Sequence, residues 1–139
     1  MITSVPKHYF PLVWKEAREH LVRFEKAARG GCTADDLGRM IVDDKQQLWI
    51  IANDDNEIIG AVVTQVSDLP QKKVLEIVAC AGNSDNRLDE FLYESMKELE
   101  EFARLNYCDV IRVEGRKGWS RALKPYGFDQ TAIILEKEI

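Results

Sequence analysis

The sequence predicts one α/β domain over residues 1–139, with a central mixed, twisted sheet flanked by helices. Two observations predict this class. Short, nearly continuous apolar segments of strand length recur along the chain, and amphipathic segments with the period of a helix lie between them. Strands that are apolar along their whole length need cover on both faces, and helices packed on a sheet provide it. The expected order is α-α-β-β-β-α-β-α-β.

The composition limits the class of protein before any motif is considered. A chain of 139 residues with 45% hydrophobic and 31% charged residues can bury a core without disulfides. The net charge of −5 argues against a dedicated surface for nucleic acid or for an anionic membrane. No apolar run approaches the roughly 20 residues of a membrane span, and the N-terminus lacks a signal-peptide core. We therefore expect a cytoplasmic protein that does not bind membranes.

The cysteines indicate a reducing compartment. Cys32, Cys80 and Cys108 are an odd number with no CxxC spacing. This pattern is typical of free thiols, and neither a disulfide framework nor a zinc site is expected from it. The two histidines also have no metal-binding spacing, so we expect no metal.

The first part of the chain predicts two helices. Residues 1–8 form a short lead-in. Over residues 9–28 apolar side chains recur every three or four positions, which indicates one helix ended by the Gly-Gly pair that follows. Thr33 is the expected N-cap of a second helix, because Asp35 and Asp36 follow in its first turn.

The middle and end of the chain predict five strands and two helices. Three apolar strands, 48–52, 58–66 and 74–81, are joined by turns of Asn-Asp-Asp-Asn and Asp-Leu-Pro-Gln composition. A long amphipathic helix over about 87–105 follows the third strand. A fourth strand, a basic loop and a short helix come next, and the expected last strand covers 131–136.

Three stretches carry a resemblance to a known family. They are the hairpin 51–60, which ends in glycine, the helix-strand run 102–113, and the ending Leu-Lys-Pro-Tyr-Gly-Phe at 123–128. Together they resemble the GNAT superfamily of N-acetyltransferases, over nearly the whole chain. The run 115–123 is similar to small GNAT-like proteins carried by tailed phages, which would place the chain in a host cytoplasm or a virion.

The resemblance implies acetyl-CoA as cofactor, with its diphosphate bound by a Q/R-x-x-G-x-G/A loop at the start of the long helix. The cofactor-binding residues that this register implies are Asn83, Ser84, Asn86 and Arg87. Asn86 stands in place of the first glycine and tolerates positive φ, whereas Leu88 adds bulk at the second. Three nearby acids place negative charge at the phosphate position, and they equally suit a helix start that binds no ligand.

The same resemblance assigns roles to the third strand. The backbone of Val78, Ala79 and Cys80 would hold the pantetheine arm and the acyl carbonyl. Glu76 lies where the family often has a carboxylate and would act as the general base that takes the amine proton. Alternation places Glu76 on the face opposite to its neighbours. The alternative is an ordinary solvent-facing strand residue.

Two further groups could take part in catalysis. The tyrosine that protonates the departing thiolate in the family falls on Leu123 here, and Tyr126 is the nearest candidate to replace it. The alternative for Tyr126 is a packed tyrosine, with water as the acid. Cys80 could suggest an acyl-cysteine, but it has no partnering base in the sequence, and a buried cysteine at a strand end usually packs as a small apolar residue.

A basic stretch stands out in this acidic chain. It could bind the 3′-phosphate of CoA, mainly through Arg116, or an acidic protein partner, or a nucleic-acid backbone, and it could equally be a solvated face. Its cations are Arg112, Arg116, Lys117, Arg121 and Lys124.

Two hypotheses for function follow. In the first, the protein is an acyl-CoA-dependent N-acyltransferase that transfers an acetyl group to an amine and has a degenerate cofactor loop. In the second, it has kept the fold without the chemistry and serves as an interaction or virion-associated module through its basic face. The altered loop and the displaced tyrosine favour the second hypothesis, whereas the prevalence of activity in the superfamily favours the first, which we prefer. The acceptor amine could be a small molecule or a protein.

Overall fold

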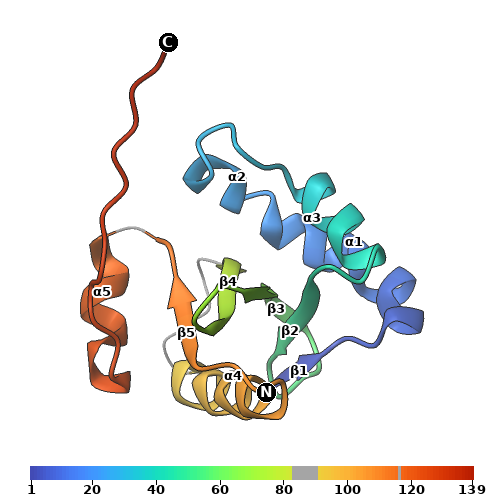
Figure 1. Cartoon of the computed structure of the whole chain (residues 1–139). Coiled ribbons are helices and arrows are strands. Elements are labelled where there is room, and N and C mark those ends of the chain that lie inside the picture. Colours follow the sequence, from blue (N-terminus) through green and yellow to red (C-terminus); the bar gives the residue numbers. More distant parts are fainter. Residues whose placement is uncertain (83–90, 116) are drawn as a thin grey trace.

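The computed structural model describes residues 1–82, 91–115 and 117–139. A five-stranded sheet in the order β1-β2-β3-β4-β5 forms its centre. Neighbouring strands are antiparallel from β1 to β4, and β4 and β5 are parallel. Helices α1 and α3 cover one face of the sheet and α4 covers the other (Figure 1). The predicted α/β class with a mixed sheet is confirmed.

The N-terminal segment contributes a strand that the sequence pattern did not predict. Strand β1, Ile2–Ser4, pairs antiparallel with β2 at the edge of the sheet, and Ile2 is buried. A single buried residue gives no alternation that could be read in a sequence. The first helix is preceded by the 3-10 turn η1, Lys7–Tyr9.

The predicted helix over 9–28 is divided in two. Helix α1 is Phe10–Leu21 and α2 is Phe24–Ala27. The bend between them allows Phe24 to pack on the same apolar cluster as Leu21. Helix α3, Ala34–Val42, begins at the predicted cap Thr33.

The three predicted central strands are present. They are β2, Gln47–Ala52, β3, Ile58–Asp68, and β4, Lys73–Gly82. Helix α4 is Leu92–Leu105 and returns the chain to β5, Val110–Val113. Helix α5, Lys117–Leu123, follows and continues into the 3-10 turn η3, Lys124–Tyr126. No helix among the described residues is long and apolar enough to cross a membrane.

The predicted last strand over 131–136 is not formed, and this expectation is corrected. Residues 127–139 have no regular secondary structure and leave the body as an extended tail (Figure 1). A strand needs a neighbour for its backbone hydrogen bonds, and the structure pairs no described strand with this segment. The apolar composition that favoured a strand remains exposed to solvent.

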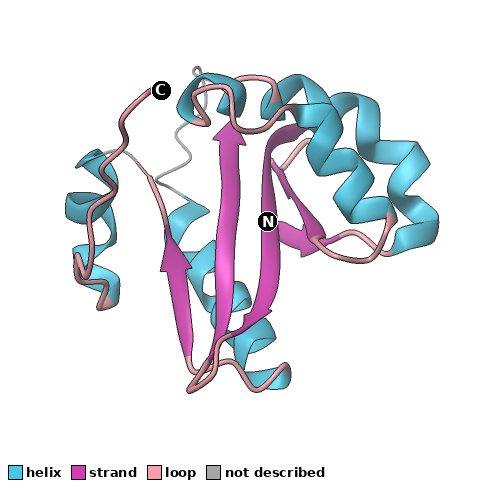
Figure 2. Cartoon of the chain, turned by 45° about the horizontal axis from the view of Figure 1, so that its top comes forward, coloured by secondary structure: helices cyan, strands magenta, loops and turns pink. Residues whose placement is uncertain are grey.

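The core contains two apolar clusters on opposite faces of the sheet, and Figure 2 shows the helices that lie over these faces. The α1-side cluster joins α1 and α3 to the strands, and its buried members are Ala17, Leu21, Ala34, Leu37, Ile41, Leu48, Ala61, Val63 and Ala79. The α4-side cluster contains Ile2, Trp49, Ile51, Ile59, Val62 and Leu99. Trp49 and Phe102 pack edge to face there, with ring centroids 5.3 Å apart.

Candidate functional site

The pairing between β4 and β5 ends before β4 does. The two strands pair from Val74 with Val110 to Ile77 with Val113. Strand β4 continues to Gly82, so residues 78–82 have no strand partner on the β5 side within the described part of the chain. We call residues 78–82 the open segment of β4. The Gly82 carbonyl accepts a hydrogen bond from Arg23. No strand among the described residues pairs with the rest of this edge, whose backbone amides and carbonyls can bind an extended ligand.

A β-bulge at Val78 marks the start of the open segment. The consecutive residues Val63 and Thr64 of β3 pair with Ala79 and Ile77, so Val78 has no residue opposite it. Val78 and Ala79 both contact the α1-side cluster, whereas Ile77 packs on the α4-side cluster. A bulge bends its strand and increases the local twist. This bend lies where β4 and β5 cease to pair.

Cys80 lies within the open segment and packs against the α4-side cluster. Although part of the residue reaches the surface, burial raises the pKa of its thiol to about 11. The thiol is therefore protonated at neutral pH. A protonated thiol is a poor nucleophile, so this cysteine is suited to packing and not to forming an acyl-enzyme.

Glu76 lies two residues before the bulge in a row of polar residues that crosses three strands. It pairs in register with Gln65 of β3 and with Arg112 of β5, so the three side chains share one face of the sheet. Gln65 is fixed by a hydrogen bond from Gln46, whose Nε2 donates to Gln65 Oε1 over 2.9 Å. Glu76 itself is half-buried. The face is the one opposite to Ile77, as strand alternation predicted.

Arg23 adds a cation at the far end of the open segment. The side chain projects from the bend between α1 and α2, and its Nη1 donates to the carbonyl of Gly82. The predicted phosphate loop begins directly after Gly82. Sequence reasoning missed Arg23, because nothing in its spacing distinguishes it from other surface arginines; only the bend that starts α2 brings it to β4.

The remaining predicted site residues are distributed as follows. Asn83, Ser84, Asn86, Arg87 and Arg116 lie outside the described residues. Helix α5 runs antiparallel along β5 (Figures 1 and 2), so the turn η3 that follows it and ends at Tyr126 lies towards the start of β5. The open segment lies beyond the end of β5. The structure thus groups Glu76 with Val78, Ala79 and Cys80 on β4, whereas η3 follows α5 towards the start of β5.

The described cations of the basic stretch lie at solvent-exposed positions. Arg112 is on β5, Arg121 is on α5, and Lys124 begins η3. Arg112 shares its face of the sheet with Glu76, whereas Arg121 belongs to α5, which runs beside β5 (Figure 1). The stretch is therefore spread over three elements.

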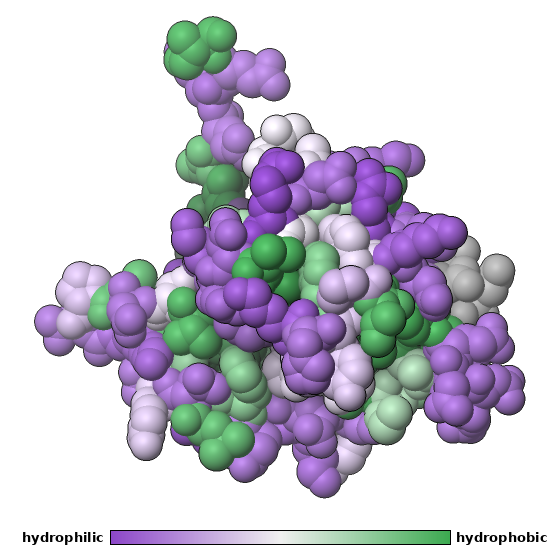
Figure 3. Space-filling model, turned by 90° about the vertical axis from the view of Figure 1, so that its right-hand side faces the viewer, coloured by the Kyte–Doolittle hydropathy of each residue, from purple (hydrophilic) through white to green (hydrophobic). Residues whose placement is uncertain are grey.

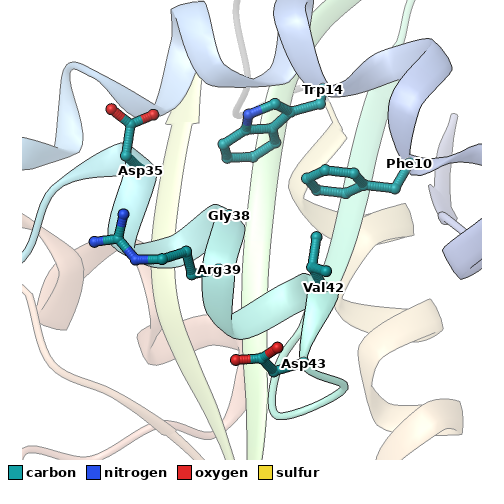
Figure 4. A pocket seen from close by; sticks show the side chains of 7 residues that line it. All are labelled: Phe10, Trp14, Asp35, Gly38, Arg39, Val42 and Asp43. Atoms are coloured by element: carbon teal, nitrogen blue, oxygen red, sulfur yellow. The ribbon is translucent and has the colours of Figure 1, made fainter.

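A surface pocket of about 410 Å³ lies between α1 and α3 (Figure 4), and none of its lining residues belongs to the open segment. The rings of Phe10 and Trp14 stack on one side of it, with centroids 5.0 Å apart. Charged side chains from α3, among them Asp35 and Arg39, lie on the other side. The pocket contains none of the residues that the sequence predicted for the site.

Comparison with known proteins places this geometry in a structural class. No protein-family model matches the sequence, and no curated protein matches it. Solved structures do match. A Trypanosoma brucei acetyltransferase superposes with a TM-score of 0.73 at 11% identity, covering 100% of this chain and 99% of that chain. A predicted acetyltransferase with acetyl-CoA from Clostridium acetobutylicum gives 0.69 at 15% identity, with 99% and 95% covered.

A GNAT family acetyltransferase from Staphylococcus aureus gives a TM-score of 0.65 at 14% identity, covering 100% of this chain and 98% of that chain. At sequence identities this low, structural similarity shows a shared fold and does not show a shared chemistry. The chain therefore has the GNAT fold. The predicted fold class is confirmed, except for its expected last strand over 131–136.

Proposed function

We propose that the protein is a GNAT-type N-acyltransferase that transfers an acetyl group from acetyl-CoA to an amine. The observation that carries this proposal is the open segment of β4, with the bulge at Val78 at its start. The pantetheine arm of acetyl-CoA is an extended chain with amide groups, and an unpaired strand edge offers hydrogen-bonding groups to such a chain. The similar solved structures include acetyltransferases, which supports the same proposal.

The residues of the chain fit the two ends of this ligand. The backbone of residues 78–80 would accept the acyl end of the arm. At Gly82 the guanidinium of Arg23 supplies a positive charge beside the segment in which the phosphate loop is predicted. Arg116 remains our predicted contact for the 3′-phosphate.

Acetyl-CoA supplies an acyl group activated as a thioester. In the proposed reaction Glu76 accepts a proton from the ammonium form of the acceptor, directly or through a water, because only the free amine is nucleophilic. The amine nitrogen bonds to the acyl carbon, and the carbon–sulfur bond breaks. The nitrogen then loses its second proton to water, and water protonates the thiolate, so that the products are the amide and free CoA.

Amide hydrogen exchange with acetyl-CoA tests the proposal. We expect slower exchange in residues 78–82, and unchanged exchange in β1 at the opposite edge of the sheet. Adenosine 3′,5′-bisphosphate, which lacks the pantetheine arm, is the matched control ligand and should leave residues 78–82 unprotected. Equal exchange of the open segment with and without acetyl-CoA would reject the assignment and favour the interaction-module hypothesis.

Substitution of Glu76 tests the proposed base. A general base contributes about 10²- to 10⁴-fold to the rate, so Glu76→Gln should lower kcat by at least about 10²-fold with little change in the KM for acetyl-CoA. The loss should shrink as pH rises, because more of the amine is then already deprotonated. The control is Glu57→Gln, an exposed glutamate in the β2–β3 hairpin. Unchanged turnover in Glu76→Gln would remove Glu76 from the mechanism.

A further inference from the structure

Two side chains of opposite charge are neighbours on one face of the sheet, next to the proposed acyl site. Glu76 of β4 and Arg112 of β5 pair in register, so their side chains leave adjacent strands, about 4.8 Å apart, on the same face. Because Ile77 packs on the α4-side cluster, this is the face that carries α1 and α3. Glu76 is half-buried there and Arg112 is exposed.

Neither charge has a partner in the described part of the chain. Glu76 and Arg112 form no ion pair with each other, and neither side chain has a hydrogen bond to a described residue. Gln65, the other neighbour of Glu76, is engaged elsewhere. Its Oε1 accepts from Gln46 Nε2 over 2.9 Å, and its Nε2 donates to Ser67 Oγ over 3.3 Å. A half-buried carboxylate without a partner is costly, so this position favours a cationic ligand.

Carboxylates from other segments do not occupy Arg112. Glu114, two residues further along the chain, forms no ion pair with it. The tail over residues 127–139 stands out from the body (Figure 3), and its Glu136 forms an ion pair with Arg29. Arg112 therefore offers a guanidinium whose planar fork of donors suits a carboxylate of a ligand.

We infer that the acceptor is a free α-amino acid, whose carboxylate binds Arg112 and whose ammonium group binds Glu76. This assignment rests on the proposed function, because it uses Glu76 as the base and the open segment of β4 as the acyl site. One carbon separates the two charged groups of an α-amino acid, which suits a carboxylate and a guanidinium on adjacent strands.

The reaction follows the steps proposed above. The ammonium loses one proton to Glu76, the α-nitrogen bonds to the acyl carbon, and the carbon–sulfur bond breaks. The nitrogen loses its second proton to water, and water protonates the thiolate. The products are an N-acetyl amino acid and CoA.

The same pair of charges disfavours acceptors that lack a carboxylate. An ammonium held at Glu76 lies beside the guanidinium of Arg112, and this contact between like charges is unfavourable unless a negative group of the ligand offsets it. Polyamines bring further cations and are disfavoured more strongly. The C-terminal amide of an amino acid keeps the amine and the side chain and lacks only the carboxylate, so it is the matched comparison.

Paired acceptors give the first test, with transfer followed as release of the CoA thiol. One reaction contains a mixture of the free L-amino acids that have uncharged side chains, and the other contains a mixture of their C-terminal amides. We expect the free acids to react at least about tenfold faster at equal, low concentration. This order is opposite to that of the free amine present, since the carboxylate of a free amino acid stabilises its own ammonium group. Spermidine should react no faster than the amides.

Substitution of Arg112 tests its role directly. Arg112→Ala should raise the apparent KM for the amino-acid mixture about 10- to 100-fold and leave the KM for acetyl-CoA unchanged. Arg112→Lys should recover part of the loss, because lysine keeps the charge without the fork. Arg112→Glu should reverse the preference, so that the amides react faster than the free acids. The control is Arg104→Ala, an exposed arginine of α4 on the opposite side of the sheet, which should change neither KM.

A binding measurement separates this assignment from the proposed function. In isotope-labelled protein, the Nε–H resonance of Arg112 is identified by its loss in Arg112→Lys. It should shift when the free amino acids are added and stay in place when the amides are added. A shift in a protein that transfers acetyl groups to no amine would keep the amino-acid site and reject the acyltransferase.

Three results would overturn the amino-acid acceptor. The first is equal transfer to the free acids and the amides by a protein in which acetyl-CoA protects residues 78–82, which would leave the acyltransferase standing. The second is an Arg112 resonance that the free amino acids do not move. The third is a raised KM for acetyl-CoA in Arg112→Ala with an unchanged KM for the amino acids, which would assign this cation to the cofactor.

Discussion

Val78 shows how one residue shapes the candidate site. Because it has no partner in β3, the strand alternation resets, and Ala79 takes the same face as Val78. Without the extra residue, Ala79 would point towards α4. The residue also marks where β4 leaves β5. A hydrogen-bonding edge is thus available inside the sheet, where β4 extends past its pairing with β5.

Cys80 beside it is predicted to be chemically inert in the folded protein. With a thiol pKa of about 11, only about one thiol in a thousand is ionised at pH 8. Alkylation by iodoacetamide should therefore be slow at Cys80 in the native state and fast after unfolding, as read by mass spectrometry. Cys80→Ala should keep acetyl transfer. Abolished transfer in a folded Cys80→Ala protein would instead indicate an acyl-cysteine.

Gly38 is predicted to be essential for the packing of α1 on α3. A Cβ at this position would lie 2.7 Å from the ring of Trp14, which itself stacks on Phe10. Overpacking of this kind costs about 1–3 kcal/mol, which exceeds the gain of about 1 kcal/mol that alanine brings to a helix. Gly38→Ala should therefore lower the free energy of unfolding in a urea titration. Gly118→Ala in α5, where nothing lies within 4 Å, should leave it equal or higher.

Helix α3 illustrates how an element can be specified locally. The Thr33 hydroxyl accepts a hydrogen bond from the Asp36 amide over 3.1 Å, and the Asp36 carboxylate accepts one from the Thr33 amide over 2.9 Å. This reciprocal pair satisfies backbone groups of the first turn locally, and the Glu25 carboxylate of α2 accepts a further hydrogen bond from the Ala34 amide over 2.8 Å. Loss of the cap in Thr33→Ala should cost about 1 kcal/mol.

The cap makes the stability of the protein depend on pH. The hydrogen bond from the Thr33 backbone amide lowers the pKa of the Asp36 carboxyl in the folded state. Because the pKa is lower in the folded state, the ionised Asp36 carboxylate stabilises the protein above its unfolded-state pKa of about 4. This stabilisation is lost as the pH falls through the folded-state pKa. Asp36→Asn should therefore flatten the decline in unfolding temperature below about pH 4. An unchanged acid limb in Asp36→Asn would assign that decline to other carboxylates.

The two apolar clusters are predicted to unfold together as one cooperative unit. They lie on opposite faces of the same strands, so neither can form without the sheet. Leu21→Ala in the α1-side cluster and Leu99→Ala in the α4-side cluster should each cost about 2–5 kcal/mol. Each should shift a single transition seen identically by circular dichroism and by fluorescence. Leu12→Ala, at a 74% exposed position, should change little.

The amino-acid sequence determined the elements that depend on local signals. The Thr33 cap, the apolar runs of β2 to β4, the hairpin turns and the long amphipathic helix are specified by near neighbours, and all were predicted. The position of Glu76 on the face opposite to Ile77 also followed from alternation alone.

Tertiary structure decided the features that need a partner distant in the chain. Strand β1 depends on one buried isoleucine and on β2, and the bulge at Val78 appears only against β3. Arg23 reaches β4 only because the first helix bends. Residues 131–136 have the composition of a strand, but a strand exists only where a neighbour supplies its hydrogen bonds, and no described strand supplies them to these residues.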